Sequence, residues 1–124
     1  MEQNQAVLVR RDTREKTVAP LDKVAETAAE LLETIQADML ARAEAHLAAH
    51  FYDALTYDEF KDAAENKPGF IRAMWCGDLA CELKIKEDTT CTSRCMPFEQ
   101  ERISETCVCC GKPAKKLVYW GKAY

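Results

Sequence analysis

Two cysteine pairs constrain the fold of this chain more than any other feature of its sequence. The first pair is Cys76 and Cys81, and the second is Cys107 and Cys110, a CxxC followed by a glycine. Two thiol pairs from distant points of a chain are how a tetrahedral four-thiolate zinc site is built. The gap of 25 residues between the pairs is longer than usual, so the segment between them has room to form structure of its own. We therefore expect a fold in which the two pairs meet around a zinc ion.

The residues around the pairs suit zinc chemistry. Asp78 predicts the start of a helix, and Cys81 would lie in its first turn, where the positive end of the helix dipole favours the thiolate. Gly111 permits a tight turn whose backbone N–H groups point at sulfur. Four thiolates leave no coordination position open, so we expect a structural metal and no hydrolytic catalyst. The alternative is a set of buried, inert cysteines, and the paired spacing favours zinc.

The remaining cysteines are weaker candidates for ligands. Cys109 could replace Cys110 as the fourth ligand in a CxC arrangement, and the CxxC spacing favours Cys110. Cys91 and Cys95 lie on an extended segment without a turn, so we expect them to be packing residues. A second interpretation of Cys107 and Cys110 is a redox dithiol, which would need an exposed cysteine of low pKa and no bound metal.

Histidines, aromatic residues and lysines supply no further strong motif. His46 and His50 lie one helical turn apart, but a leucine follows the first of them, so the HExxH metalloprotease pattern fails and we expect an exposed or capping role. Trp75, Tyr119 and Trp120 are expected in the core and not on a base-stacking platform. Four lysines form a basic cluster, interpreted first as a solvated face and second as a contact for RNA phosphate: Lys112, Lys115, Lys116 and Lys122.

Composition limits the function classes. The seven cysteines are an odd number, and the polar opening residues lack the apolar region of a signal peptide, so we expect reduced cysteines and a cytoplasmic location. No apolar run approaches the roughly 20 residues that span a bilayer, so we expect no membrane partner. A net charge of −4 disfavours a module that coats nucleic acid. The four glycines are too far apart for a P-loop or a dinucleotide fingerprint.

The first half of the chain predicts one strand and one long helix. Residues 5–12 hold an apolar, partly β-branched run, and residues 12–16 read as a polar turn. Pro20 suits the first turn of a helix that we expect to run to about His50. Its inward stripe is expected to contain Leu21, Val24, Ala28, Leu31, Ile35, Met39, Ala43 and Leu47. Its other face, interpreted as solvated, carries Asp22, Glu26, Glu30, Glu33, Asp38, Arg42 and Glu44.

The second half alternates strands and helices. Thr56 and Glu59 form a capping-box pattern that starts a short helix. The helix that Asp78 begins is expected to place Leu79, Leu83 and Ile85 inward. The other expected elements are strands at 70–75 and 114–120, an extended piece at 91–96 and a polar loop at 99–106. The order β-α-β-α-β-β, with the short helix after Thr56 as an addition between the long helix and the second strand, predicts one α+β domain over residues 1–124, with helices on one face of a mixed sheet.

The last strand is expected to be apolar on both faces. Alternation places Leu117, Tyr119 and Gly121 on one side and Val118 and Trp120 on the other. Such a strand is typically buried or docked.

Four motifs in order along the chain resemble the C-terminal zinc-binding domain of prolyl-tRNA synthetase. They are WCG at 75–77, TSRCMPF at 92–98, CGKPA at 110–114 and GKAY at 121–124. The stretch QAVLVRRDT at 5–13 resembles the entry to that domain, after the anticodon-binding domain. The branch is the archaeal and eukaryote-like one, which also occurs in some bacteria.

The resemblance implies a two-layer α/β sandwich and zinc ligands at Cys76, Cys81, Cys107 and Cys110, because the family's second pair is a CxxC followed by glycine. The parent enzyme would be a homodimeric class II synthetase that ligates proline to tRNA(Pro) with ATP and Mg²⁺. In the family this domain packs against the catalytic domain, and the terminal carboxylate, here that of Tyr124, reaches toward the active site.

The residues that would carry the catalysis are not in this sequence. No class II active-site motif is present, so we expect an excised, catalytically inactive domain of a larger enzyme. The alternative is a free-standing zinc-binding module that interacts with RNA, for which we would expect a steep dependence of affinity on salt.

Overall fold

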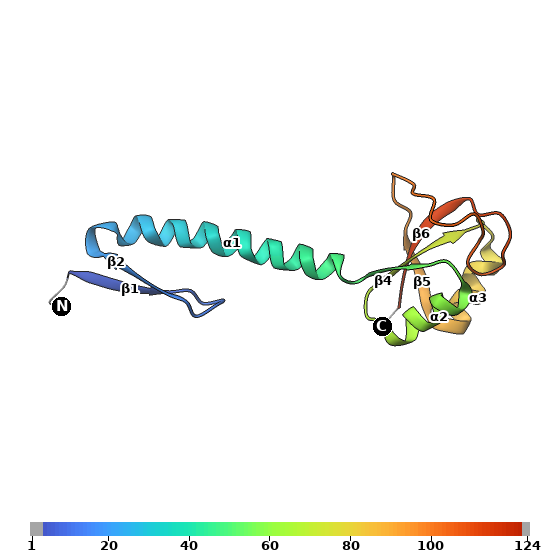
Figure 1. Cartoon of the computed structure of the whole chain (residues 1–124), viewed down its shortest axis with the longest axis horizontal. Coiled ribbons are helices and arrows are strands. Elements are labelled where there is room, and N and C mark those ends of the chain that lie inside the picture. Colours follow the sequence, from blue (N-terminus) through green and yellow to red (C-terminus); the bar gives the residue numbers. More distant parts are fainter. Residues whose placement is uncertain (1–3, 123–124) are drawn as a thin grey trace. The chain divides into compact units, whose positions relative to one another are not determined.

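The computed structural model describes residues 4–122 (Figure 1). Contacts group the chain into two compact units, Met1–His46 and Leu47–Tyr124. The single domain expected over 1–124 stays a prediction. None of the described helices combines the length and the apolar composition that a bilayer-spanning segment requires.

The first unit is a β-hairpin followed by helices. Strand β1 (Gln5–Val9) pairs antiparallel with β2 (Lys16–Pro20), and Val7 lies opposite Val18. A single 3-10 turn, η1 (Leu21–Lys23), leads into α1 (Val24–Ala48). The sequence pattern predicted the first strand but missed the second. Thr17 and Val18 are β-branched and suit a strand, and the proline that ends β2 was interpreted as the start of the helix.

The long helix buries less than its apolar stripe predicted. None of its residues is buried, and only Val24, Thr27, Ala28, Leu31 and Ile35 are half-buried. Strands of five residues extend about 17 Å, whereas a helix of 25 residues extends about 37 Å. The hairpin is therefore too short to cover the whole stripe, and Met39 and Leu47 remain 54% and 48% exposed.

A charged network joins the hairpin to the helix. The Arg10 guanidinium is buried and donates through Nη2 to Asp12 at 2.8 Å and to Asp38 at 2.7 Å, while Arg42 donates to Asp12 at 3.1 Å. The hydrogen bond from Arg10 lowers the pKa of Asp12 to about 2. Asp38 and Arg42 are exposed, as expected for a solvated face, and their side chains also pair with residues of the hairpin.

The second unit contains a four-stranded mixed sheet. The strand order is β3-β4-β6-β5, with β3 parallel to β4 and the other two pairs antiparallel. Its elements are β3 (Phe51–Ala54), α2 (Tyr57–Asn66), β4 (Phe70–Trp75), α3 (Leu79–Thr89), β5 (Cys91–Cys95) and β6 (Lys116–Lys122). The α+β class and the mixed sheet are confirmed. The predicted order β-α-β-α-β-β is not, because β2 and β3 were missed.

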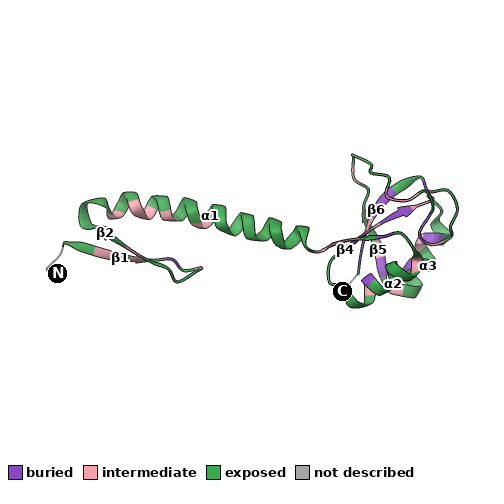
Figure 2. Cartoon of the chain, in the orientation of Figure 1, coloured by how far each residue is buried: buried purple, intermediate pink, exposed green. Residues whose placement is uncertain are grey.

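The core of this unit lies between the sheet and two helices (Figure 2). Phe60 of α2 and Ile85 of α3 belong to one cluster with Val118 and Trp120 of β6, and all four side chains are almost fully buried. On the other face of β6, Leu117 packs with Ile103 of the loop that follows β5. The alternation of residues 117–121 therefore gives β6 two apolar faces, as predicted.

Local signals in the second unit are partly confirmed. The capping box at the start of α2 is present, with the Thr56 side chain and the Glu59 side chain each bonded to the other residue's backbone N–H. In α3, Ile85 is buried as expected, but Leu79 and Leu83 are 62% and 56% exposed. The buried face of α3 contains Cys81 and Ile85 instead.

Candidate metal centre

The first cysteine pair lies at the junction of β4 and α3. Cys76 directly follows β4, and Gly77 adopts φ +89°, a left-handed conformation that suits glycine. Asp78 is the N-cap of α3, and its side chain accepts a hydrogen bond from the Ala80 N–H at 3.0 Å. The turn that this cap creates places Cys81 in the first turn of the helix, as predicted, and brings its sulfur within 3.7 Å of the Cys76 sulfur.

The second pair lies on a tight turn formed by residues 107–112, here called the knuckle. The Cys107 N–H donates to the Lys112 carbonyl at 2.7 Å, and the Gly111 N–H donates to the Cys107 carbonyl at 2.9 Å. Gly111 has φ +69°, so the turn needs the conformational freedom that its position after the CxxC suggested. Both cysteines of the pair thereby face the same side of a short loop.

Backbone hydrogen bonds attach the knuckle to the end of β4. The Val108 N–H donates to the Met74 carbonyl at 2.9 Å, and the Lys115 N–H donates to the Trp75 carbonyl at 2.8 Å. These bonds lie directly beside Cys76 in the sequence. Sequence reasoning missed them, because backbone pairing across more than 30 residues leaves no signal in the side chains.

The four sulfurs are arranged as a small tetrahedral ion requires. The Sγ atoms of Cys76, Cys81, Cys107 and Cys110 all lie within 4.8 Å of one another. The Cys76–Cys81 and Cys76–Cys110 separations are 3.7 and 3.8 Å. A tetrahedron with Zn–S bonds of about 2.3 Å has edges of roughly 3.8 Å. These four residues could therefore hold a metal ion, and the donor set fits zinc.

The environment of the sulfurs differs within the cluster. Cys76, Cys81 and Cys107 are buried, whereas Cys110 is exposed. Burial raises the pKa of Cys76 and, more strongly, that of Cys81. A hydrogen bond from the Lys112 backbone lowers the pKa of Cys110 to about 7. A bound cation would favour all four thiolates, because its charge offsets the burial of the others.

The other three cysteines lie outside this group of sulfurs. Cys109 is half-buried and packs against the cluster, but its sulfur does not belong to the set within 4.8 Å. Cys91 is buried in the core, as expected for a packing residue. Cys95 is exposed at the end of β5, so the expectation that it packs was wrong.

The structure also locates the two histidines, the aromatic residues and the lysines that were weaker candidates for a functional role. His46 lies exposed in the last turn of α1 and His50 is half-buried before β3, and neither belongs to a metal-ligand group among residues 4–122. Trp120 is buried, and Trp75 and Tyr119 are half-buried against the core. The four lysines of the basic cluster are all exposed. Tyr124 lies outside the described residues.

Comparisons with known proteins point to one family. The family described as "Prolyl-tRNA synthetase, C-terminal" matches residues 57–124. The chain is 70% identical over 124 residues to a "Proline--tRNA ligase" of Lachnospira eligens and 60% identical over 124 residues to one of Clostridium botulinum (strain Loch Maree / Type A3). Each match covers 100% of this chain and 26% of the relative.

A solved structure agrees with the sequence relatives. The "Crystal Structure of Prolyl-tRNA Synthetase from Cryptosporidium parvum complexed with L-Proline and AMP" superposes with a TM-score of 0.89 at 30% identity. The match covers 99% of this chain and 26% of that chain. The chain thus spans about a quarter of the length of the proteins that it matches, and the family match covers more than half of it. It belongs to the family of prolyl-tRNA synthetase C-terminal domains.

Proposed function

We propose that this chain is the C-terminal, zinc-stabilised part of a prolyl-tRNA synthetase, the class II enzyme that joins proline to tRNA(Pro) with ATP. The main support is the convergence of four thiols within 4.8 Å in a chain that is 70% identical to a proline--tRNA ligase. ATP, Mg²⁺ and proline are handled elsewhere in the longer protein, because the chain carries no class II motif. The parent enzyme acts as a homodimer in the cytoplasm.

The metal in this proposal is zinc, and its role is structural. Cys76 and Cys81 bind from the β4–α3 junction, and Cys107 and Cys110 bind from the knuckle. Zinc supplies four bonds that join these two segments, and four thiolates leave no position for a substrate. The amide groups of the knuckle orient the thiolates and stabilise their charge.

A pair of variants tests the ligand set. Cys110→Ser is expected to release zinc, because it removes one of the four converging sulfurs, whereas Cys109→Ser is expected to keep one zinc per chain. Elemental analysis of both purified variants, beside the unmodified protein, measures this directly. The reverse outcome would assign the site to Cys109. A metal-free unmodified protein with all four thiols freely alkylated would contradict the zinc site itself.

The chain alone is expected to be inactive. We expect no proline-dependent exchange between ATP and pyrophosphate, and full exchange in the full-length synthetase under the same conditions. Exchange above background by the isolated chain would contradict the proposal.

The alternative of a free-standing RNA-binding zinc module is less favoured, because the matched relatives are ligases about four times longer. Tight, salt-sensitive tRNA binding by the isolated chain would revive that alternative.

Contacts with the rest of the synthetase involve the first unit. Val7, Val9 and Val18 are 57%, 51% and 58% exposed on one face of the two-stranded hairpin. Two-stranded sheets are marginally stable unless their apolar face is covered. We propose that polypeptide outside this chain covers that face. Amide hydrogen exchange in β1 and β2 should then be slower in the full-length synthetase than in the chain, and equal rates would contradict this contact.

The terminal carboxylate of Tyr124 is proposed to approach the active site of the parent enzyme. Deleting Tyr124 from the full-length synthetase should reduce proline activation while zinc content and thermal stability stay close to wild type. Unchanged activity would show that the terminal carboxylate is incidental. Loss of folding would show a structural role instead.

A further inference from the structure

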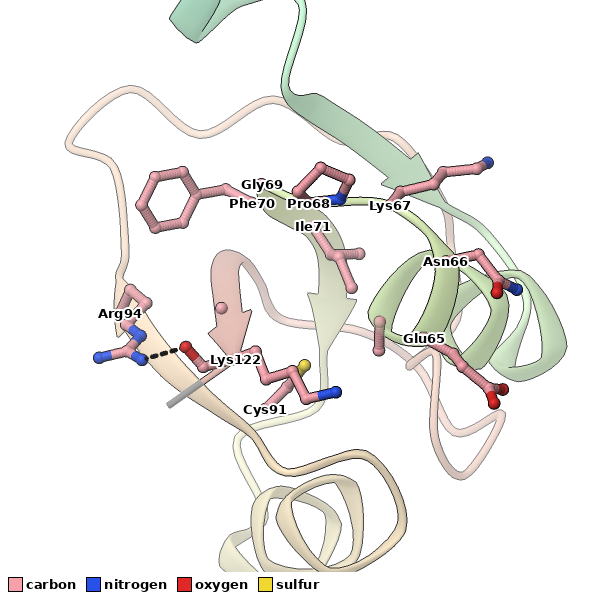
Figure 3. A pocket seen from close by; sticks show the side chains of 12 residues that line it. Glu65, Asn66, Lys67, Pro68, Gly69, Phe70, Ile71, Cys91, Arg94 and Lys122 are labelled. Atoms are coloured by element: carbon pink, nitrogen blue, oxygen red, sulfur yellow. Dashed lines mark hydrogen bonds between the residues drawn. The ribbon is translucent and has the colours of Figure 1, made fainter. Parts of the chain in front are cut away.

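A cavity of about 760 Å³ opens at the end of the four-stranded sheet, away from the cysteine cluster. The last turn of α2 and the loop after it form one wall, and β5 with the end of β6 forms the other (Figure 3). Sites for small molecules typically have volumes of roughly 300–1,000 Å³. The cavity is therefore large enough for a small organic ligand.

The rim of this cavity is positively charged. Arg94 and Lys122 lie on one side of it, and Lys67, whose ammonium pairs with Asp62 at 3.7 Å, lies on the wall that follows α2 (Figure 3). Glu65 is the one acidic side chain among the described lining residues. None of the ion pairs between described residues involves Arg94 or Lys122. In a chain of net charge −4, this local excess of positive charge attracts anions.

Arg94 is held in place by the backbone of β6. Its Nη2 donates to the Lys122 carbonyl at 2.9 Å. Gly121 leaves the space that the guanidinium occupies, because a Cβ there would lie 3.2 Å from Arg94 Nε and 3.3 Å from Phe70 Cδ1. A guanidinium carries five N–H donors, so one bond to the backbone leaves four for an anion.

The opposite wall is fixed by a second glycine. Gly69 has φ +146°, and a Cβ there would lie 2.2 Å from the His50 carbonyl oxygen. The same oxygen accepts a hydrogen bond from the Phe70 N–H at 2.9 Å. The Phe70 ring stacks on Phe51 with centroids 5.7 Å apart. The wall is thus pre-formed, which reduces the entropy lost when a ligand binds.

The lining also includes apolar groups. Ile71 and Cys91 are buried at 2% and 1% exposure and contribute to it together with Ala64 and the Phe70 ring. A polar rim above apolar side chains suits a ligand with one charged end and one apolar end.

We propose that this cavity binds a small organic anion, a carboxylate or phosphate attached to a compact apolar body. Arg94 receives the anion through paired N–H donors, Lys122 adds charge, and Ile71 and Phe70 contact the body. This site does not include the four clustered cysteines, and the proposal does not rest on the ligase function proposed above.

Phenyl phosphate is the probe that tests the site, by NMR titration of the zinc-loaded chain. Saturable shifts are expected for amides at 66–71, 91–94 and 121–122. Arg94→Gln should weaken binding about tenfold or more, and Lys122→Gln about threefold. Lys86→Gln on α3 is the matched control and should change the dissociation constant less than about twofold. Inorganic phosphate and benzyl alcohol should each bind at least about tenfold more weakly than phenyl phosphate.

Several outcomes would overturn the site. Equal binding by Arg94→Gln, shifts scattered over the surface, or equal binding of benzyl alcohol would each do so. If Arg94→Gln fails to fold, Lys122→Gln decides alone, and an unchanged dissociation constant overturns the proposal. If phenyl phosphate binds to the chain but not to the full-length synthetase, the proposal is also overturned, because a side chain of the longer protein would then occupy the cavity.

Discussion

The two units of this chain differ in how they are held together. The second unit buries large side chains such as Phe60, Ile85 and Trp120 in a continuous core. In the first unit, the only buried side chains among described residues are Ala19 and Arg10. The second unit therefore has a core that can stabilise its fold by itself. The first unit is stabilised mainly by a few charged contacts, and its apolar side chains remain largely exposed. Four experiments test this contrast.

Metal removal should have the largest effect and should affect one unit only. If zinc joins the two cysteine pairs, its binding stabilises the zinc half of the second unit by on the order of 10 kcal/mol at neutral pH, and chelation is expected to loosen that half without unfolding the core between the sheet and the helices. Amide hydrogen exchange should rise at the knuckle and at the end of β4 and stay unchanged in β1 and β2. Cys95→Ser, at an exposed thiol outside the cluster, serves as the control. An equal increase in amide hydrogen exchange in both units would contradict the idea that the two units are stabilised differently.

Truncating one apolar side chain in each unit should give the next largest difference. Phe60→Ala should lower the free energy of unfolding of the second unit by about 3–5 kcal/mol, because it leaves a cavity under Trp120. Leu32→Ala on α1, at a side chain already 67% exposed, should change stability by less than about 0.5 kcal/mol. Denaturant titration of both variants measures the two values. A large effect at Leu32 would reveal a core in the first unit.

Removing the cap of α2 should have a smaller effect. Thr56→Ala takes away the acceptor for the Glu59 N–H and is expected to lower stability by about 1 kcal/mol. Thr56→Ser keeps the hydroxyl, and its stability should differ from that of the unmodified protein by no more than about 0.3 kcal/mol. Thermal unfolding of the two variants gives the comparison. Equal losses in both would assign the effect to the methyl group.

Protonation of Asp12 should produce the smallest effect, and it should appear in the first unit. The folded pKa of Asp12 is about 2, below the ordinary value of 3.8, chiefly because of the hydrogen bond from Arg10. The stabilisation is thus fully present above about pH 4 and is lost as the pH falls through about 2. Exchange of hairpin amides between pH 5 and 2 should show this loss. Asp12→Asn should remove most of the pH dependence, and an unchanged profile would contradict this origin.

Features set by local chemistry were predictable from the sequence. The Thr56–Glu59 spacing predicts a capping box because the reciprocal bonds involve only neighbouring residues. The cysteine spacing predicts a cluster because thiolate ligation needs two pairs, and the structure brings together the four sulfurs that were named. Zinc occupancy itself stays a prediction.

Features set by distant pairing were not predictable. Phe51–Ala54 is a strand because it lies parallel to β4, and four residues alone give no alternation long enough to detect. In α3, Leu79 and Leu83 are four residues apart, and so are Cys81 and Ile85. Periodicity identifies both stripes, but the position of the sheet and the cluster decides which one is buried.

The knuckle has a consequence for the order of events during folding. The Cys76 and Cys110 sulfurs are 3.8 Å apart although 34 positions separate the residues. Cys76 and Cys81 are close in sequence, so they can offer two ligands as soon as α3 forms. The other two thiols arrive only after a long loop has closed, which is entropically slower. A zinc ion held by the first pair alone would still exchange its remaining ligands with solvent, so closure of the knuckle should be the step that makes the ion inert to exchange.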